Sequence, residues 1–149
     1  MGQPAPTVGP TVAAAEDAGT PRPLPAFRDL PGEAFEEWIA VRLDRLGFHV
    51  ARTPRSRDGG IDLIATRPDT LGIETRLLLQ CKNRGEPAGV SVVRELRGVI
   101  PDRSAGTTPV LACPGGFTAD AKTFAAAHGV RLWGRAELSE LDRQASLTT

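Results

Sequence analysis

Three consecutive leucines, Leu77 to Leu79, stand in the middle of the chain, and Gln80, Cys81 and Lys82 follow them directly. Neighbouring side chains of a β-strand point to opposite faces, so an uninterrupted apolar run predicts a strand that is buried on both faces. Residues 76–82 are therefore expected to form the middle of a sheet.

Helical and strand patterns surround this segment. Residues 32–46 form the first expected helix, because apolar residues recur there at helical spacing before Gly47: Phe35, Trp38, Ile39, Leu43 and Leu46. Other strands are expected at 48–52, 61–66, 109–113 and 130–133, and other helices at 91–100, 118–128 and from about residue 135. The order αβββαβαβα predicts an α/β fold with a mixed central sheet flanked by helices.

The first 26 residues differ in composition from the rest of the chain. They hold six of the 13 prolines and no aromatic residue. Such a segment buries too little apolar surface to offset the entropy of ordering, so residues 1–26 are predicted to be a disordered arm. Residues 27–149 are predicted to form one folded domain.

Charge and cysteine content narrow the functional classes. The chain has 18 basic and 18 acidic residues, so its formal net charge is zero and any contact with nucleic acid must be local. Two cysteines are too few for a disulfide scaffold, and the longest apolar runs are far too short to span a membrane. The expectation is a cytoplasmic protein with no membrane partner.

Chemically useful side chains gather at one end of the expected sheet. Gln80 and Lys82 share one face of the central strand because strand side chains alternate. Asp62 lies one residue into the neighbouring strand, and adjacent strands are about 4.8 Å apart. A carboxylate, an amide oxygen and an ammonium group are therefore expected to converge at this end.

This set of groups suits a hard divalent cation. Asp62, Gln80 and the backbone carbonyl of Cys81 are the expected oxygen ligands, and Lys82 is expected to face the attacking water or a phosphate. Glu36 lies on the edge of the apolar stripe of the first helix, where a carboxylate needs a partner, so it is a further candidate ligand. Taken singly, each residue also has a structural explanation, such as a turn residue for Asp62.

The use of lysine adds to the argument. The chain has 16 arginines and only two lysines, Lys82 and Lys122, yet the basic residue beside the candidate carboxylate is a lysine. Lysine differs from arginine most where a compact, titratable point charge is needed. The pattern therefore favours a chemical function for Lys82.

Five short segments, in order and at compatible spacing, resemble the catalytic domain of Mrr-type restriction endonucleases, which belong to a broad nuclease superfamily. The resemblance covers about residues 30–142. The segments are Gly32-Glu33-Ala34-Phe35-Glu36, Asp58-Gly59-Gly60-Ile61-Asp62, Gln80-Cys81-Lys82, Val93-Arg94-Glu95-Leu96-Arg97-Gly98 and Phe117-Thr118-Ala119-Asp120-Ala121.

The resemblance implies a restriction-endonuclease-like fold and a Mg²⁺-dependent DNA endonuclease, with Mn²⁺ as a substitute ion. It implies that Asp62 and Gln80 are metal ligands, that Lys82 orients water or stabilises the transition state, and that Glu36 is the acid carried by the first helix. Gln80 replaces the acidic residue of the wider superfamily, which lowers the negative charge of the site by one.

Partners and two alternative functions remain open. Arg52, Arg55, Arg57 and Arg84 flank the expected site and are candidate DNA phosphate contacts, although 16 arginines must also occupy the surface. Cutting both strands needs two active sites, so a homodimer is expected, and a separate recognition subunit is a further expected partner. The alternatives are a structure-selective nuclease, similar to a Holliday-junction resolvase, and a catalytically silent DNA-binding or assembly module.

Overall fold

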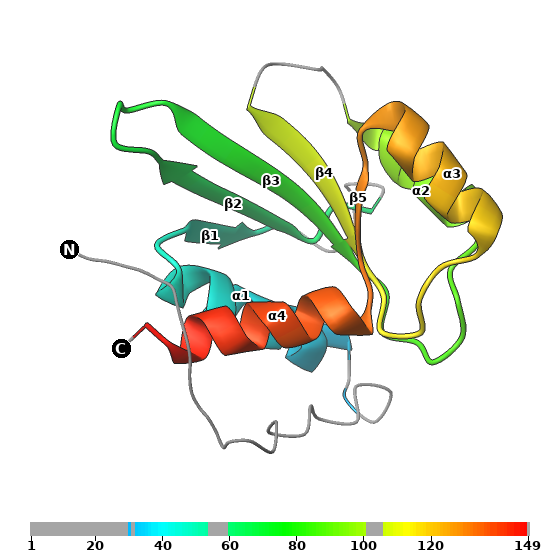
Figure 1. The fold of residues 1–149 in the computed structure, drawn as a ribbon, viewed down its shortest axis with the longest axis horizontal. Helices are drawn as coiled ribbons and strands as arrows, with labels where there is room; N and C mark the ends of the chain where they lie inside the picture. The colour runs from blue at the N-terminus through cyan, green and yellow to red at the C-terminus, as the bar shows by residue number, and fades with distance from the viewer. Residues whose placement is uncertain (1–29, 31, 54–59, 101–105, 149) are drawn as a thin grey trace.

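The computed structural model describes residues 30, 32–53, 60–100 and 106–148. Its five strands form one sheet, with two helices against each face (Figure 1). In chain order the elements are α1 (Gly32–Arg45), β1 (His49–Arg52), β2 (Leu63–Pro68), β3 (Glu74–Cys81), α2 (Val90–Val99), β4 (Thr107–Ala112), α3 (Ala119–His128), β5 (Arg131–Trp133) and α4 (Arg135–Ser146). The predicted order αβββαβαβα and the mixed α/β sheet are confirmed.

Strand pairing in the sheet changes from antiparallel to parallel at β3. The strand order is β1-β2-β3-β4-β5, in which β1, β2 and β3 form an antiparallel meander. On its other side β3 pairs with β4 in parallel, and β4 pairs with β5 in the same way. Helices α2 and α3 make the two crossovers that parallel pairing requires. The predicted arm, residues 1–26, lies outside the described residues, as do Arg55 and Arg57.

The central strand is buried on both faces, as its three leucines predict. Leu79 packs with α1 and α4 in one apolar cluster, whereas Leu78 packs with α2 and α3 in the other. Two boundaries of the hairpin differ from expectation. Strand β2 runs on to Pro68 and β3 begins at Glu74, because these two residues still pair across the hairpin.

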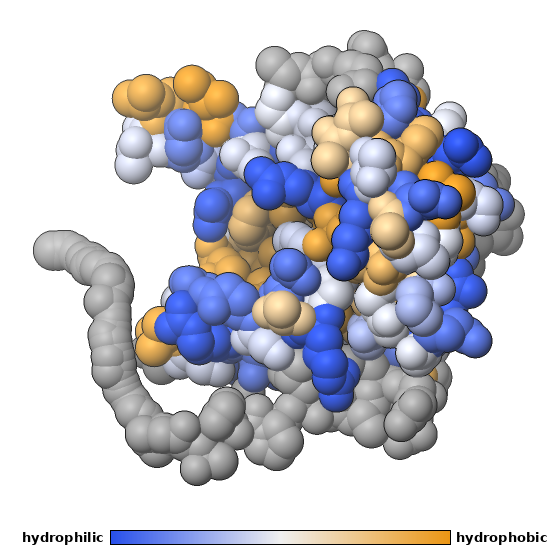
Figure 2. Space-filling view, turned by 45° about the vertical axis from the view of Figure 1, so that its right-hand side comes forward, coloured by the Kyte–Doolittle hydropathy of each residue, from blue (hydrophilic) through white to orange (hydrophobic). Residues whose placement is uncertain are grey.

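The turn between β2 and β3 exposes two large apolar side chains, Leu71 and Ile73. Asp69 orders this turn, because its Oδ1 accepts from the Leu71 N–H at 2.8 Å and from the Ile73 N–H at 2.9 Å. Elsewhere on the face drawn in Figure 2, hydrophilic and apolar side chains are mixed. The exposed apolar surface of this hairpin is therefore local, and it lies at the end of β3 opposite to Gln80.

An ion pair joins the two helices on the first face. The Arg42 Nε donates to Asp142 Oδ1 of α4 at 3.0 Å, and its guanidinium lies 4.0 Å from the centre of the Trp38 ring. Both charged side chains are largely buried. This contact fixes α1, the helix that carries Glu36, against α4. No helix in the described part of the chain is long and apolar enough to cross a membrane.

We expect Asp142→Ala to lower the free energy of unfolding by about 1–3 kcal/mol, because Arg42 would lose its carboxylate in a largely buried position. Glu140→Ala is the matched control, since Glu140 forms an exposed pair with Arg143 one turn away and such pairs contribute about 0–1 kcal/mol. Urea unfolding of both variants would check this. Equal losses of unfolding free energy in the two variants would show that the Arg42–Asp142 pair stabilises the fold no more than an exposed pair does.

Candidate active site

Asp62 lies just before β2, where the ladder between β2 and β3 becomes irregular. Leu63 is the ladder partner of Leu79, and the Asp62 N–H also bonds to the Leu79 carbonyl, at 2.7 Å. Two successive residues therefore face one residue of β3, which is the arrangement of a β-bulge. The bulge explains why Ile61 packs in the α2–α3 cluster, on the opposite face to Leu63. In a regular strand, Ile61 and Leu63 would lie on the same face, because they are two residues apart.

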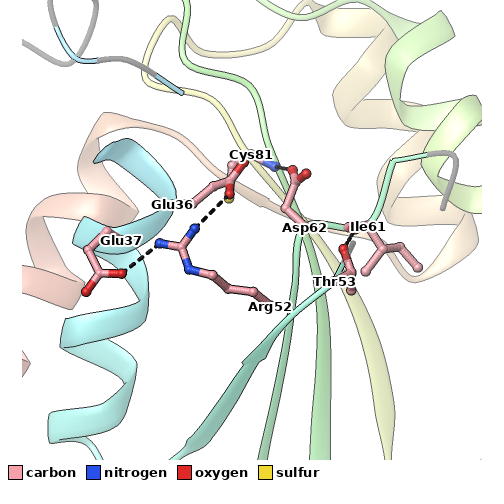
Figure 3. Close-up of polar contacts among 7 residues, drawn as sticks. All are labelled: Glu36, Glu37, Arg52, Thr53, Ile61, Asp62 and Cys81. Atoms are coloured by element: carbon pink, nitrogen blue, oxygen red, sulfur yellow. Dashed lines mark hydrogen bonds and ion pairs between the residues drawn. The ribbon is translucent and has the colours of Figure 1, made fainter. Parts of the chain in front are cut away.

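The Asp62 carboxylate closes the end of this ladder. Its Oδ2 accepts a hydrogen bond from the Cys81 N–H at 2.7 Å (Figure 3). The next amide, that of Lys82, donates to Ala112 on the β4 side at 2.8 Å. Because backbone groups of successive strand residues point to opposite edges, the Cys81 carbonyl points with its N–H toward the β2 side. Since β2 begins only at Leu63, it offers that carbonyl no ladder partner.

The side-chain oxygen of Gln80 is a candidate ligand for a cation. Its side chain is buried, with 5% of the residue exposed, and its Oε1 has no hydrogen-bond partner among the described residues. A buried amide oxygen without a partner costs about 1–3 kcal/mol. Among the described residues no three His, Cys, Asp or Glu side chains are placed to hold a metal. The donors that fit are oxygens of three kinds, from Asp62, Gln80 and the Cys81 backbone, which suits a hard divalent ion.

Gly60 makes room for the Gln80 amide. A Cβ built on Gly60 would lie 2.6 Å from Gln80 Nε2, and the Gly60 φ is +132°. From the sequence, Gly60 was noted only within the segment Asp58-Gly59-Gly60-Ile61-Asp62, without a link to Gln80. The signal that was available is the Gly59-Gly60 pair, which ends two positions before Asp62.

Lys82 follows the last residue of β3. If the alternation of β3 continues past Cys81, Lys82 lies on the same side of the strand as Gln80, and this stays a prediction. It is partly buried, and among the described residues its ammonium group has no ion pair or hydrogen bond. The charge is therefore not neutralised by a described carboxylate.

Glu36 approaches the site from α1, on the face of Cys81. It is buried, with 6% of the residue exposed, and its Oε1 accepts from Arg52 Nη1 of β1 at 3.3 Å. The other guanidinium nitrogen, Nη2, donates to Glu37 Oε1 at 2.7 Å (Figure 3). Arg52, a predicted phosphate contact, thus bonds to two carboxylates. Glu37 was not singled out from the sequence.

The Cys81 thiol lies in a buried and acidic environment. Burial raises the pKa of the Cys81 thiol well above its ordinary value, and the charges of Asp62 and then Glu36 raise it further, while Arg52 acts in the opposite direction. The thiol is therefore held in its neutral form. The side chain of Cys81 is not expected to serve as a thiolate ligand.

The structure thus groups the predicted residues around the end of β3. Glu36, Asp62 and Cys81 lie together at one side of the strand end, Gln80 lies beside Gly60, and Lys82 follows Cys81 directly. Arg84 follows in the next loop, and its Nε is buried without a hydrogen-bond partner among the described residues.

The mixed five-stranded sheet with helices on both faces is the fold of a restriction-endonuclease-like nuclease domain. The restriction endonuclease family model Mrr_cat matches residues 27–141, and the chain belongs to this family. The family generally uses divalent metal ions.

Three known proteins are similar to this chain in sequence or in fold. The uncharacterized mitochondrial protein C824.03c of Schizosaccharomyces pombe is 32% identical over 89 residues, which are 58% of this chain and 36% of that protein. The DNA modification-dependent restriction endonuclease AspBHI is 25% identical with a TM-score of 0.61, covering 83% of this chain and 35% of AspBHI. EndoMS in a complex with double-stranded DNA is 18% identical with a TM-score of 0.51, covering 70% and 45%, and shares the fold. The chain therefore spans only about a third of C824.03c and of AspBHI.

We expect Gly60→Ala to displace the Gln80 amide and to weaken Mn²⁺ binding by about tenfold, because a misplaced ligand costs roughly one such factor. Gly72→Ala is the control: Gly72 also has a positive φ, +80°, but a Cβ added there would have no neighbour within 4 Å. Both variants should lose about 1–2 kcal/mol of stability from backbone strain. Calorimetric titration of Mn²⁺ distinguishes the Gly60→Ala variant from the Gly72→Ala variant. Equal Mn²⁺ affinities of these variants would show that Gly60 does not position Gln80.

The raised pKa of Cys81 predicts slow alkylation. At pH 8.5 we expect iodoacetamide to modify Cys81 in the folded protein at least about tenfold more slowly than in urea, with the rate still rising above pH 9, because only the thiolate reacts. Glu36→Gln should speed the reaction, since it removes a charge that raises the pKa. Mass spectrometry of the tryptic peptide 77–82 would follow this thiol alone. A folded-state rate equal to that in urea would contradict the shifted pKa.

Proposed function

We propose that this chain hydrolyses phosphodiester bonds of DNA with the help of Mg²⁺, for which Mn²⁺ can substitute. The observation that carries the proposal is the buried Gln80 Oε1, which has no hydrogen-bond partner among the described residues. Gln80 precedes Cys81, whose N–H bonds to the Asp62 carboxylate. Membership of the restriction endonuclease family supports the same reaction. AspBHI, the 25% identical relative, acts on modified DNA, and EndoMS has been captured on double-stranded DNA.

Each residue has a defined task in this proposal. Asp62, Gln80 and the Cys81 carbonyl would hold the ion, and Glu36 would approach it from α1. A bound divalent ion neutralises charge on the phosphate and lowers the pKa of a water molecule. Asp62 also fixes the Cys81 peptide through its Oδ2, so one carboxylate holds the ladder end and would also help to hold the ion.

Lys82 would act on the phosphate or on the attacking water. Its ammonium group is not paired with a described carboxylate, so its full charge is available to an anion. Arg84, in the following loop, remains a proposed phosphate contact. Cutting both strands would take two copies of the site, so we propose a homodimer on DNA, with target choice supplied by a separate recognition subunit.

Incubation of the purified full chain with supercoiled plasmid tests the proposal. We expect cleavage with Mg²⁺ or Mn²⁺ and none with EDTA, and methylated and unmethylated plasmids are compared side by side. Asp62→Ala and Lys82→Arg should each reduce the rate by about 100-fold or more, because an arginine fork cannot replace a compact point charge. Lys122→Arg, which changes the second lysine of the chain on the exposed side of α3, should retain the wild-type rate.

The same assay separates the alternatives. Preference for a four-way junction over plasmid would favour a structure-selective nuclease. DNA binding without cleavage under any metal condition would favour a silent binding module. Full activity of Lys82→Arg would remove the role assigned to Lys82.

A further inference from the structure

Arg52 bridges two successive residues of α1 beside the candidate site. Its Nη1 bonds to the buried carboxylate of Glu36, and its Nη2 bonds to the carboxylate of Glu37, whose side chain is 60% exposed. The guanidinium group comes from β1, the strand at the edge of the sheet (Figure 3). One cation is therefore shared between a buried acid and an exposed acid.

The two bonds are unequal. The contact with Glu37 is 2.7 Å long, which is typical of a strong charge-assisted hydrogen bond, whereas the contact with Glu36 is 3.3 Å. Arg52 can therefore release Glu36 and still keep its shorter bond. Because its side chain is 41% exposed, the guanidinium group also has solvent around it in which to shift.

Glu36 is the carboxylate for which two cations would compete. It approaches the strand end where Asp62 bonds to the Cys81 amide, and the charges of both acids act on Cys81. A divalent ion held at this end would be attracted to Glu36 and would repel the guanidinium group bonded to it. Binding of the ion and the Arg52–Glu36 contact should therefore oppose each other.

We propose that Arg52 is an exchangeable positioning residue: it bonds to Glu36 before a divalent ion binds, and it passes to Glu37 alone when the ion takes Glu36. The inference rests on the proposed function, because it uses the metal site placed at the end of β3. Glu37 thereby gains a role as the acceptor that receives Arg52. For this exchange, only the Arg52 side chain has to move.

If Arg52 passes between Glu36 and Glu37, substitutions of Arg52 and Glu37 should have interdependent effects on Mn²⁺ affinity. Arg52→Met keeps much of the side-chain length but removes the competing cation, so Mn²⁺ should bind more tightly. Glu37→Gln removes the charged acceptor and leaves Arg52 with Glu36, so Mn²⁺ should bind more weakly. Once Arg52 is absent, Glu37 has nothing to receive, so Glu37→Gln should then change the affinity very little.

Calorimetric titration of Mn²⁺ into the full chain tests this as a double-mutant cycle. We expect Arg52→Met to tighten binding about threefold to tenfold, Glu37→Gln to weaken it about threefold, and the double variant to match Arg52→Met within about twofold. Glu95→Gln is the matched control, because Glu95 is an exposed acid on α2 and its loss changes the net charge equally. Its affinity should equal that of the wild type.

Each outcome has a separate meaning. Additive effects of Arg52→Met and Glu37→Gln would overturn the exchange, since Glu37 would then act as a nearby charge only. Unchanged affinity in Arg52→Met would overturn it as well, while the proposed nuclease function would stand. Absence of Mn²⁺ binding in every protein, the wild type included, would overturn the metal site and this inference together.

A thermal melt of each variant checks that the fold is kept. If Arg52→Met does not fold, Arg52→Lys takes its place, because lysine keeps the charge but cannot bridge two carboxylates with a planar fork. In that variant the proposal expects the effect of Glu37→Gln on Mn²⁺ affinity to fall below its effect in the wild type. An undiminished effect would overturn the exchange.

Discussion

The hydrogen bond between the Cys81 amide and the Asp62 carboxylate determines how the end of the sheet is built. Regular pairing of β2 with β3 ends at Leu63, and a side-chain oxygen takes the position that a backbone carbonyl would otherwise fill. This substitution ends the ladder without leaving the amide unpaired, which would be costly in a partly buried place. It also leaves the Cys81 carbonyl without a ladder partner on β2, so one bond both closes the sheet and leaves a backbone oxygen at its end.

Burial of polar side chains at the end of β3 limits how much negative charge this end can hold. Glu36 and Gln80 are two of the three buried polar or charged residues of the described chain, and both lie near the end of β3. An amide in place of a carboxylate at position 80 lowers the repulsion among the acids, and Arg52 offsets part of the charge that remains. One guanidinium group and one neutral ligand therefore allow the acids to lie close together. The balance of these charges is what a divalent ion would alter.

Much of the fold could be predicted from the sequence, because the periodicity of apolar residues fixes which side of each element is buried. The leucines of β3 are one example, because Leu79 and Leu78 are buried in clusters on opposite faces of the sheet. The bulge at Asp62 could not be predicted, because it depends on which backbone groups pair across strands. The space that Gly60 leaves for Gln80 and the shared bond of Arg52 also depend on contacts between distant segments, which no local pattern contains. Sequence reasoning therefore reached the identity of the candidate ligands, whereas the groups that orient them required the three-dimensional arrangement.

The site is also distributed very unevenly along the chain. All the candidate ligands, together with Gly60 and Arg52, fall between residues 36 and 82, within α1 and the antiparallel meander. In the parallel half, α2 and α3 cover the other face of β3, whereas α4 packs beside α1 and holds it through the Arg42–Asp142 ion pair. The candidate ligands therefore come from one short contiguous stretch, and the later half supports it. Changes in that half would reach the candidate site through the pairing of β3 with β4, which includes the bond from the Lys82 amide to Ala112, and through helix packing.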